Sequence, residues 1–240
     1  MLSNTRGIVL HTTKFGENSL IITLYTRNFG RESCIVNATG GIRSKNKAAL
    51  MQPLYILDLE IYRHKNRELQ RVRESRLCEP YLSIPFDVYK SCQAIFLSEI
   101  LFRILQEEES NTALYDFMES ALVYFDLMKE GSASFHLWFL ARLTEYLGIF
   151  PHLGSEKEGW FDLKKGVIAG QVPDHPFFME QDTTGLFIQI LSLNINDLAN
   201  FRTTHNQRND LLIKLLDYFQ LHFDTLGNIH SLAVLKEVFD

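Results

Sequence analysis

The chain has 240 residues, of which 46% are hydrophobic and 22% charged, and its net charge is −5 at pH 7. This balance supports a packed core and excludes wholesale disorder, and the length suffices for two domains or one large one. Three widely spaced cysteines without a CxxC pair argue against a disulfide framework and against a cysteine-built zinc site. The sequence has no signal-peptide pattern and no apolar run of the ~20 residues that span a bilayer, so we expect a soluble protein of the reducing cytoplasm.

Strand patterns fill the first 80 residues. Five segments there are rich in β-branched residues or alternate apolar with polar ones: residues 7–13, 20–26, 31–38, 54–62 and 69–78. Turns at Gly16 and Gly30 join the first three segments, which predicts a meander, and the last two segments predict a longer hairpin. Residues 39–47 are basic and lack periodicity, which predicts a loop. Five strands within about 75 residues indicate a small barrel.

Beyond Pro80 the apolar residues recur at helical spacing. The pattern predicts a helix over residues 88–107, which ends in three successive glutamates. A second helix is expected to follow a cap at Ser110 or Asn111, and a third to start after Gly131.

The remainder of the chain mixes irregular structure with helices. Residues 151–181 are rich in Gly and Pro and are expected to be irregular, with a short hairpin formed by residues 160–162 and 166–169. A capping-box pattern at residues 204–207 predicts the start of a long helix, and residues 231–239 predict a last short one.

The charges divide at the same place as these patterns. Residues 1–80 hold 13 Lys+Arg and 7 Asp+Glu, whereas residues 81–240 hold 11 Lys+Arg and 22 Asp+Glu. We therefore expect a basic β domain over residues 1–80 and an acidic helical domain over residues 81–240. Basic surfaces concentrate polyanions, so the first domain is predicted to bind nucleic acid. A solvated basic sheet surface is the alternative.

Motifs for covalent chemistry are absent from the sequence. Neither GxxxxGK[ST], GxGxxG, GxSxG nor HExxH occurs, and the eight histidines have no partner at a metal-ligand spacing. The neighbours Asp174 and His175 lie between two prolines, where a rigid turn explains them better than a catalytic pair. No enzyme activity, metal or cofactor is predicted. An unrecognised hydrolase stays open, because catalytic groups can be far apart in a sequence.

Basic residues recur at the turns, the loop and the last strand of the β domain. The candidates for phosphate contacts are Lys14, Arg27, Arg31, Arg43, Lys45, Lys47, Arg71 and Arg73, with Arg63, Lys65, Arg67 and Arg76 on the second hairpin. Among the interleaved aromatics, Phe15 and Phe29 lie at turns and are the best placed to stack on bases, whereas the others are expected in the barrel core. A basic groove with aromatic platforms is typical of sequence-tolerant single-strand binding.

Short motifs occur in a fixed order along the chain. Residues 7–20 contain a Gly-Glu pair that precedes a Ser, and residues 24–31 contain Leu-Tyr-Thr-Arg followed by Gly-Arg. Residues 48–54, the Leu147-Gly148 pair and residues 226–232 continue the set. Together they resemble the RecO family of bacterial recombination mediators over the whole length.

This resemblance implies an OB-fold barrel followed by an α-helical body. It also implies binding of single- and double-stranded DNA, annealing of complementary strands, and loading of recombinase onto DNA covered by single-stranded-DNA-binding protein (SSB). The implied partners are RecR and the acidic C-terminal tail of SSB, and the implied location is cytoplasmic and nucleoid-associated. Arg103 and Arg142 lie on Phe- and Leu-rich helices and are the candidates for contact with an acidic, Phe-ended tail; ordinary surface charge is the alternative.

The sequence departs from the family at one place. Many members carry a four-cysteine zinc site just after the Leu-Gly pair, but residues 152–200 contain no cysteine. The site cannot exist in that form, and the hairpin at residues 160–169 is expected to be held by packing alone.

We therefore predict a DNA repair and recombination mediator that works without covalent catalysis. Its β domain is expected to capture the DNA backbone electrostatically and to leave the bases free to pair with a second strand. The alternative is a protein-interaction adaptor whose OB-fold barrel binds DNA only weakly.

Overall fold

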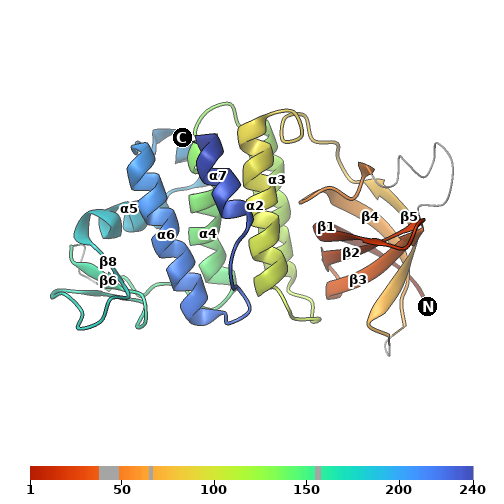
Figure 1. Ribbon diagram of the computed structural model, residues 1–240, viewed down its shortest axis with the longest axis horizontal. Coiled ribbons are helices and arrows are strands. Elements are labelled where there is room, and N and C mark those ends of the chain that lie inside the picture. The colour runs from red at the N-terminus through yellow and green to blue at the C-terminus, as the bar shows by residue number, and fades with distance from the viewer. Residues whose placement is uncertain (38–48, 65–66, 155–157, 240) are drawn as a thin grey trace. The chain divides into compact units, whose positions relative to one another are not determined.

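The computed structural model in Figure 1 describes residues 1–37, 49–64, 67–154 and 158–239. The chain forms two compact units, residues 1–126 and 127–240. The first unit therefore contains two helices as well as the barrel, and the boundary at residue 80 stays a prediction as a boundary between domains.

Five strands form a closed barrel in the first unit. They are β1 (Leu2–Phe15), β2 (Ser19–Thr26), β3 (Gly30–Asn37), β4 (Ile56–Tyr62) and β5 (Leu69–Leu77). The order around the barrel is β1-β2-β3-β5-β4, and the only parallel pair among these strands joins β3 to β5. The five predicted strands and the OB-fold barrel are confirmed.

Two of the predicted strand boundaries are wrong for physical reasons. The first strand starts at Leu2 because residues 2–8 pair with β4 while residues 7–15 pair with β2, so a polar N-terminal segment is held by both neighbours. The fourth strand starts at Ile56 because the preceding Leu54 has a left-handed backbone, with φ +61°. Leu54 is fully buried, and its amide donates a hydrogen bond to the carbonyl of Val9 at 2.8 Å.

Alternate residues of each strand fill the barrel. On β3, Cys34 and Val36 are buried while Ser33, Ile35 and Asn37 are half-exposed, as the period of two requires. The inward residues form one apolar core: Val9, Ile22, Leu24, Cys34, Val36, Met51, Leu57, Leu59 and Ile61.

Two helices complete the first unit, α2 (Val88–Ile104) and α3 (Thr112–Leu127). The predicted cap at Asn111 is confirmed, because its side chain accepts a hydrogen bond from the amide of Leu114 at 3.0 Å. The predicted end of α2 at residue 107 is wrong: the backbone leaves the helical region at Leu105, so the three glutamates belong to the connection to α3.

Buried polar groups join α2 to α3. Lys90 is 3% exposed, and its ammonium donates to the hydroxyl of Ser83 at 2.7 Å and to the carbonyls of Phe125 and Asp126 at 2.8 and 3.0 Å. The Asp126 carboxylate in turn accepts hydrogen bonds from the backbone amides of residues 82–84. These bonds satisfy a buried charge and fix the start of α2 against the end of α3.

The second unit is mostly helical (Figure 1). Its elements are the 3₁₀ turns η1 (Ser132–Ser134) and η2 (Ile195–Asn200), helices α4 (Phe135–Tyr146), α5 (Gln181–Ser192), α6 (His205–His222) and α7 (Ser231–Phe239), and strands β6 (Trp160–Asp162), β7 (Val167–Ala169) and β8 (Phe178–Met179). The predicted hairpin is confirmed as β6 and β7, and the predicted capping box forms between Thr204 and Gln207.

Strand β8 and helix α5 are among the elements of this unit that the sequence did not predict. Strand β8 has only two residues, too few for a periodic signal. Helix α5 contains two threonines and Gly185, which lower helix propensity, so its formation depends on tertiary packing.

Candidate nucleic-acid interface

One face of the barrel presents a row of side chains across four strands. Ile21 of β2 pairs with Ile35 of β3, Ile35 pairs with Arg71 of β5, and Arg71 pairs with Tyr62 of β4. Each of the four has at least one sequence neighbour that belongs to the apolar core or is buried, so these four side chains point outward. We call this row the open face.

Several cations on and beside the open face pair with no other side chain that the structure describes. Among the described residues, no salt bridge or side-chain hydrogen bond joins Lys14, Arg67 or Arg71 to another side chain, and all three are exposed. Lys14 follows the residue that pairs with Ile21, and the adjacent Phe15 is 51% exposed. The open face therefore combines apolar surface with free positive charge.

Arg31 is placed differently, because its guanidinium caps the end of α2. It donates to the carbonyls of Phe102 at 2.6 Å and Leu105 at 2.7 Å, and it lies 4.7 Å from the centre of the Phe102 ring. Burial lowers the pKa of Arg31. This candidate for phosphate contacts is therefore engaged inside the first unit.

The turn before Arg31 packs on the connection between α2 and α3. Gly30 has φ +67°, and a Cβ at this position would lie 2.3 Å from the carbonyl oxygen of Glu109. The amide of Arg31 donates to the carbonyl of Glu107 at 3.0 Å. Only glycine fits this close approach, which fixes the β2–β3 turn against the helices.

Arg27 and Arg6 also have partners on α3. The Arg27 guanidinium donates to both carboxylate oxygens of Asp116, at 3.0 and 3.1 Å. Arg6 donates to Asp58 at 3.1 Å and to Glu119 at 2.9 Å. Residues 81–126 add two Lys+Arg and eight Asp+Glu to the 13 and seven of residues 1–80, so the first unit carries 15 of each. The positive excess of the strands is thus balanced within their own unit.

Phe29 lies beneath a further ion pair. It is half-buried against the barrel core, and the Arg63 guanidinium lies 4.5 Å from the centre of its ring. Arg63 donates to the buried carboxylate of Glu32 at 2.6 Å. One face of the Phe29 ring is therefore covered by a cation rather than open to a base.

A buried amide organises the connection between β4 and β5. Gln70 is 4% exposed, and its side chain accepts a hydrogen bond from the amide of His64 at 2.8 Å. It also donates to the carbonyls of His64 at 3.1 Å and Arg67 at 2.6 Å. These three bonds hold the base of the hairpin that carries Arg67 and Arg71.

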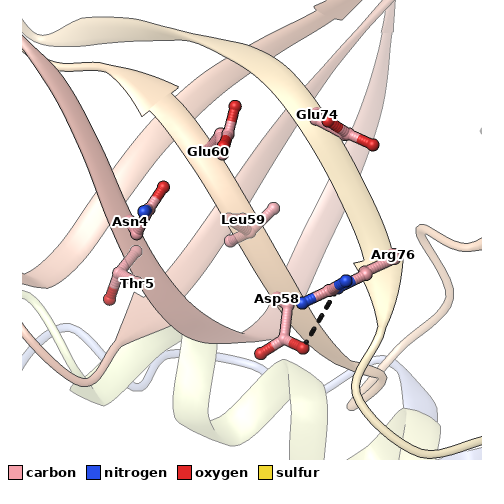
Figure 2. A pocket seen from close by; sticks show the side chains of 7 residues that line it. All are labelled: Asn4, Thr5, Asp58, Leu59, Glu60, Glu74 and Arg76. Carbon is pink, nitrogen blue, oxygen red and sulfur yellow. Dashed lines mark ion pairs between the residues drawn. The ribbon is translucent and has the colours of Figure 1, made fainter.

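The barrel surface around β1, β4 and β5 has a different character. Figure 2 shows an open groove lined by Asn4, Thr5, Asp58, Leu59, Glu60, Glu74 and Arg76. Glu60 lies directly opposite Glu74, Arg76 approaches Asp58 at 3.4 Å, and Arg73 approaches Glu60 at 3.3 Å. The carboxylates make this side unfavourable for a phosphate chain, and the candidate Arg73 lies here, paired.

Three of the candidates, Arg43, Lys45 and Lys47, lie outside the described residues, as does Lys65. Arg103 belongs to the first unit and forms an ion pair with Glu99 at 2.8 Å. Arg142 belongs to the second unit, where it pairs with Glu145 at 2.9 Å and donates to the carbonyl of Leu191.

The small sheet of the second unit is held by polar contacts as well as packing. The Asp162 carboxylate is 2% exposed; it accepts from the amides of Lys164 and Lys165 at 2.9 and 3.0 Å and approaches His175 at 3.4 Å. Thr184 accepts from the amide of Phe161 and donates to the carbonyl of Met179. The expectation of packing alone is therefore wrong.

The residues of this sheet do not fit the family's zinc site. Across the described ranges, no three His, Cys, Asp or Glu side chains gather as metal ligands. Asp162 and His175 form a pair rather than a tetrahedral set.

Two features of the interface were not predicted. Tyr62 is 43% exposed, although the sequence analysis places it in the core; the inward position of Ile61 is the signal that could have revealed it. The role of Gln70 has no local signal, because a buried glutamine is recognised only from its partners.

The first unit contains an OB-fold, because its five strands close a barrel in the order β1-β2-β3-β5-β4. Its β2–β3 face is open, and a helical region follows the barrel. Proteins of the OB-fold class bind oligonucleotides or oligosaccharides at this face. The family described as Recombination protein O N terminal matches residues 1–81, and Recombination protein O C terminal matches residues 85–227. The chain belongs to the RecO family.

Named relatives cover the whole chain. It is 34% identical over 242 residues to DNA repair protein RecO of Bacteroides fragilis, 36% identical over 243 residues to that of Flavobacterium psychrophilum, and 33% identical over 240 residues to that of Phocaeicola vulgatus. Each alignment spans 100% of both chains. Within the described part of the chain, no helix has the length and apolar character to cross a bilayer.

Proposed function

We propose that this RecO-family protein is a DNA repair and recombination mediator. In this proposal it binds single- and double-stranded DNA, anneals complementary strands and helps load recombinase onto SSB-coated DNA, without covalent catalysis. RecR and the C-terminal tail of SSB are the proposed protein partners.

The distribution of free and paired cations supports this proposal most directly. Arg27, Arg31 and Arg63 are engaged by groups of their own unit, whereas no described side chain pairs with Arg71 on the open face or with Lys14 beside it. Free cations neutralise phosphates and release counterions, and apolar surface accommodates bases. Neutralised backbones repel each other less, which favours the pairing of two bound strands.

A salt titration tests the binding step. The full-length protein is titrated with a fluorescent single-stranded oligonucleotide at two or more salt concentrations, with Arg71→Ala and the surface control Lys129→Ala beside it. We expect log affinity to fall linearly with log salt, by about 0.7 per phosphate contact, and Arg71→Ala to remove about one contact. Absence of binding by the wild-type chain at low salt contradicts the proposal.

An annealing assay tests the step that follows. Complementary labelled strands are mixed by stopped flow with and without protein, and with and without ATP. We expect acceleration without nucleotide, largest at low salt, because the repulsion that the protein relieves is itself screened by salt. Acceleration that requires ATP, or none while the strands are bound, argues against a mediator.

The partner proposal names Arg103 and Arg142 as contacts for the SSB tail. An acidic, Phe-ended peptide is titrated against Arg103→Ala and Arg142→Ala, with Arg202→Ala as the control for a lost exposed arginine. We expect the first two to weaken binding more than the control, because charge-assisted contacts to a carboxylate are lost. Equal affinity in all three variants assigns the peptide to another surface.

A protein-interaction adaptor is the second candidate, and one observation favours it. Leu82 and Phe86, just before α2, are 72% and 83% exposed, and Tyr89 in the first turn is 50% exposed. Clustered exposed apolar side chains mark surfaces where proteins meet. The salt titration separates the candidates, since an adaptor need not bind the oligonucleotide.

A further inference from the structure

We infer that Tyr62 is a base-stacking residue that gives the open face its preference for single-stranded DNA. The inference rests on the proposed function and names the form of DNA that this face takes. Three observations support it: the Tyr62 ring is exposed, Tyr62 lies opposite Arg71, and the other aromatic side chains of the barrel are buried, in contact with other side chains or outside the row.

The register fixes where the Tyr62 ring points. Ile61 is fully buried in the barrel core, so its neighbour Tyr62 projects from the outer surface, and 43% of it is exposed. Tyr62 lies directly opposite Arg71, and Arg71 lies directly opposite Ile35. Side chains of directly opposed residues share one face of a sheet. The Tyr62 ring and the Arg71 guanidinium are therefore neighbours on the open face.

Among the described residues, the Tyr62 side chain has no polar or aromatic partner, although neighbouring atoms cover part of it. None of the hydrogen bonds, ring contacts or cation contacts of the described residues involves its side chain. An exposed phenol ring beside an arginine offers a planar surface for a base and a charge for the adjoining phosphate.

Other aromatics of the barrel lack this freedom. Tyr25 is 3% exposed, Phe29 lies under the Arg63 guanidinium, and Tyr55 makes an edge contact with Tyr81 at 5.5 Å. Phe15 is exposed but lies at the end of β1, outside the row. Among these aromatics, Tyr62 is thus the one that the structure places beside Arg71 on the open face.

Stacking on Tyr62 discriminates between the forms of DNA. In a single strand the faces of the bases are available to a protein ring, whereas in a duplex they are covered by neighbouring base pairs. Phosphate contacts, by contrast, are available in both forms and carry no information about the bases. Arg71 is expected to serve both forms, and Tyr62 only the single strand.

The test compares four proteins: wild type, Tyr62→Ala, Tyr62→Phe and the control Tyr89→Ala, which removes a tyrosine of similar exposure from α2. Each is titrated with a single strand, with an abasic strand of equal length and charge, and with a duplex. Tyr62→Ala is expected to weaken single-strand binding about fivefold to 100-fold. The salt slope should stay unchanged, and affinity for the abasic strand and the duplex should stay within about twofold. Tyr62→Phe and Tyr89→Ala should match the wild type.

The outcomes separate this inference from the proposed function. If the wild type binds none of the three DNAs, both fail. If the wild type binds but Tyr62→Ala keeps full single-strand affinity, the inference alone fails. Equal losses on the intact and the abasic strand also overturn it, because they assign Tyr62 to the shape of the barrel. Should Tyr62→Ala not fold, Tyr62→Leu preserves apolar volume without a ring, and the same comparison of strands decides.

Discussion

The Arg31 guanidinium donates a hydrogen bond of 2.7 Å to the carbonyl of Leu105, the C-cap residue of α2. A cation at this end of a helix satisfies carbonyls that have no partner within the helix and complements the helix dipole. The bond joins the third strand of the barrel to a helix more than 70 residues away in the sequence.

Arg31→Ala is therefore expected to act on stability rather than on DNA affinity. Loss of charge-assisted hydrogen bonds to two carbonyls should lower the free energy of unfolding by about 1.5–3 kcal/mol. Chemical denaturation measures this loss, and oligonucleotide titration below the transition should show a change within about twofold. Arg71→Ala is the matched control, for which we expect weaker DNA binding and an unchanged free energy of unfolding. A large loss of affinity in folded Arg31→Ala assigns this arginine to the interface after all.

The three basic residues of the 39–47 segment provide a second prediction. Changing Arg43, Lys45 and Lys47 together to Ala is expected to weaken binding about equally for different DNA sequences, because phosphate contacts carry no base code. The salt slope for a single strand should fall by up to about 2, since each lost contact removes about 0.7. An unchanged affinity and slope would confine the interface to the open face.

Gln70→Glu is expected to disrupt the connection between β4 and β5. The change replaces an amide that donates to two carbonyls by an oxygen that cannot donate when ionised, at nearly equal volume. The free energy of unfolding should fall by about 1–3 kcal/mol, and limited proteolysis should cut faster between β4 and β5. A cutting pattern identical to the wild type would show that the hairpin does not depend on this side chain.

His136 predicts a specific dependence of stability on pH. Burial, assisted by the nearby Arg208 charge, lowers its pKa from 6.5 to about 3. The folded state therefore excludes a proton that the unfolded chain binds below pH ~6.5, so this contribution to stability is complete above pH ~6.5 and falls toward pH 3 by up to about 1.4 kcal/mol per unit. The difference in unfolding free energy between wild type and His136→Gln, measured from pH 7.5 to 4.5, should shrink accordingly. A difference that is constant with pH would contradict the buried neutral imidazole.

The small sheet of the second unit is expected to need no metal. Metal analysis after gel filtration should find no stoichiometric zinc, and a chelator should leave the thermal transition unchanged. Asp162→Ala should instead lower it, because the amides of Lys164 and Lys165 lose their acceptor. One zinc per chain, lost together with the folded state, would require a site that the described residues do not show.

The sequence predicted the barrel well because strand alternation is a local property. Cys34 and Val36 face the core as their spacing requires, and the same logic, carried one residue further, places Tyr62 outside. The pairing of the arginines could not be predicted in this way. Arg27 meets Asp116 across 89 positions of the chain, and a count of charges over residues 1–80 contains no information about such a partner. The basic composition therefore identified candidate cations, but only the fold shows which of them have partners among the described side chains and backbone carbonyls.

The parallel pairing of Cys34 with Gln70 constrains how the barrel can be made during synthesis. Its partners are 36 positions apart (70 − 34), and until β5 has left the ribosome β3 has an exposed edge and the barrel cannot close. An unpaired strand edge invites pairing with another chain. Nascent chains stalled before residue 77 should therefore be cleaved by protease and captured by chaperones, and chains stalled well beyond it should resist both. The risk of aggregation through this strand edge therefore arises during synthesis, before α2 and α3 have left the ribosome. It does not depend on the stability of the folded protein.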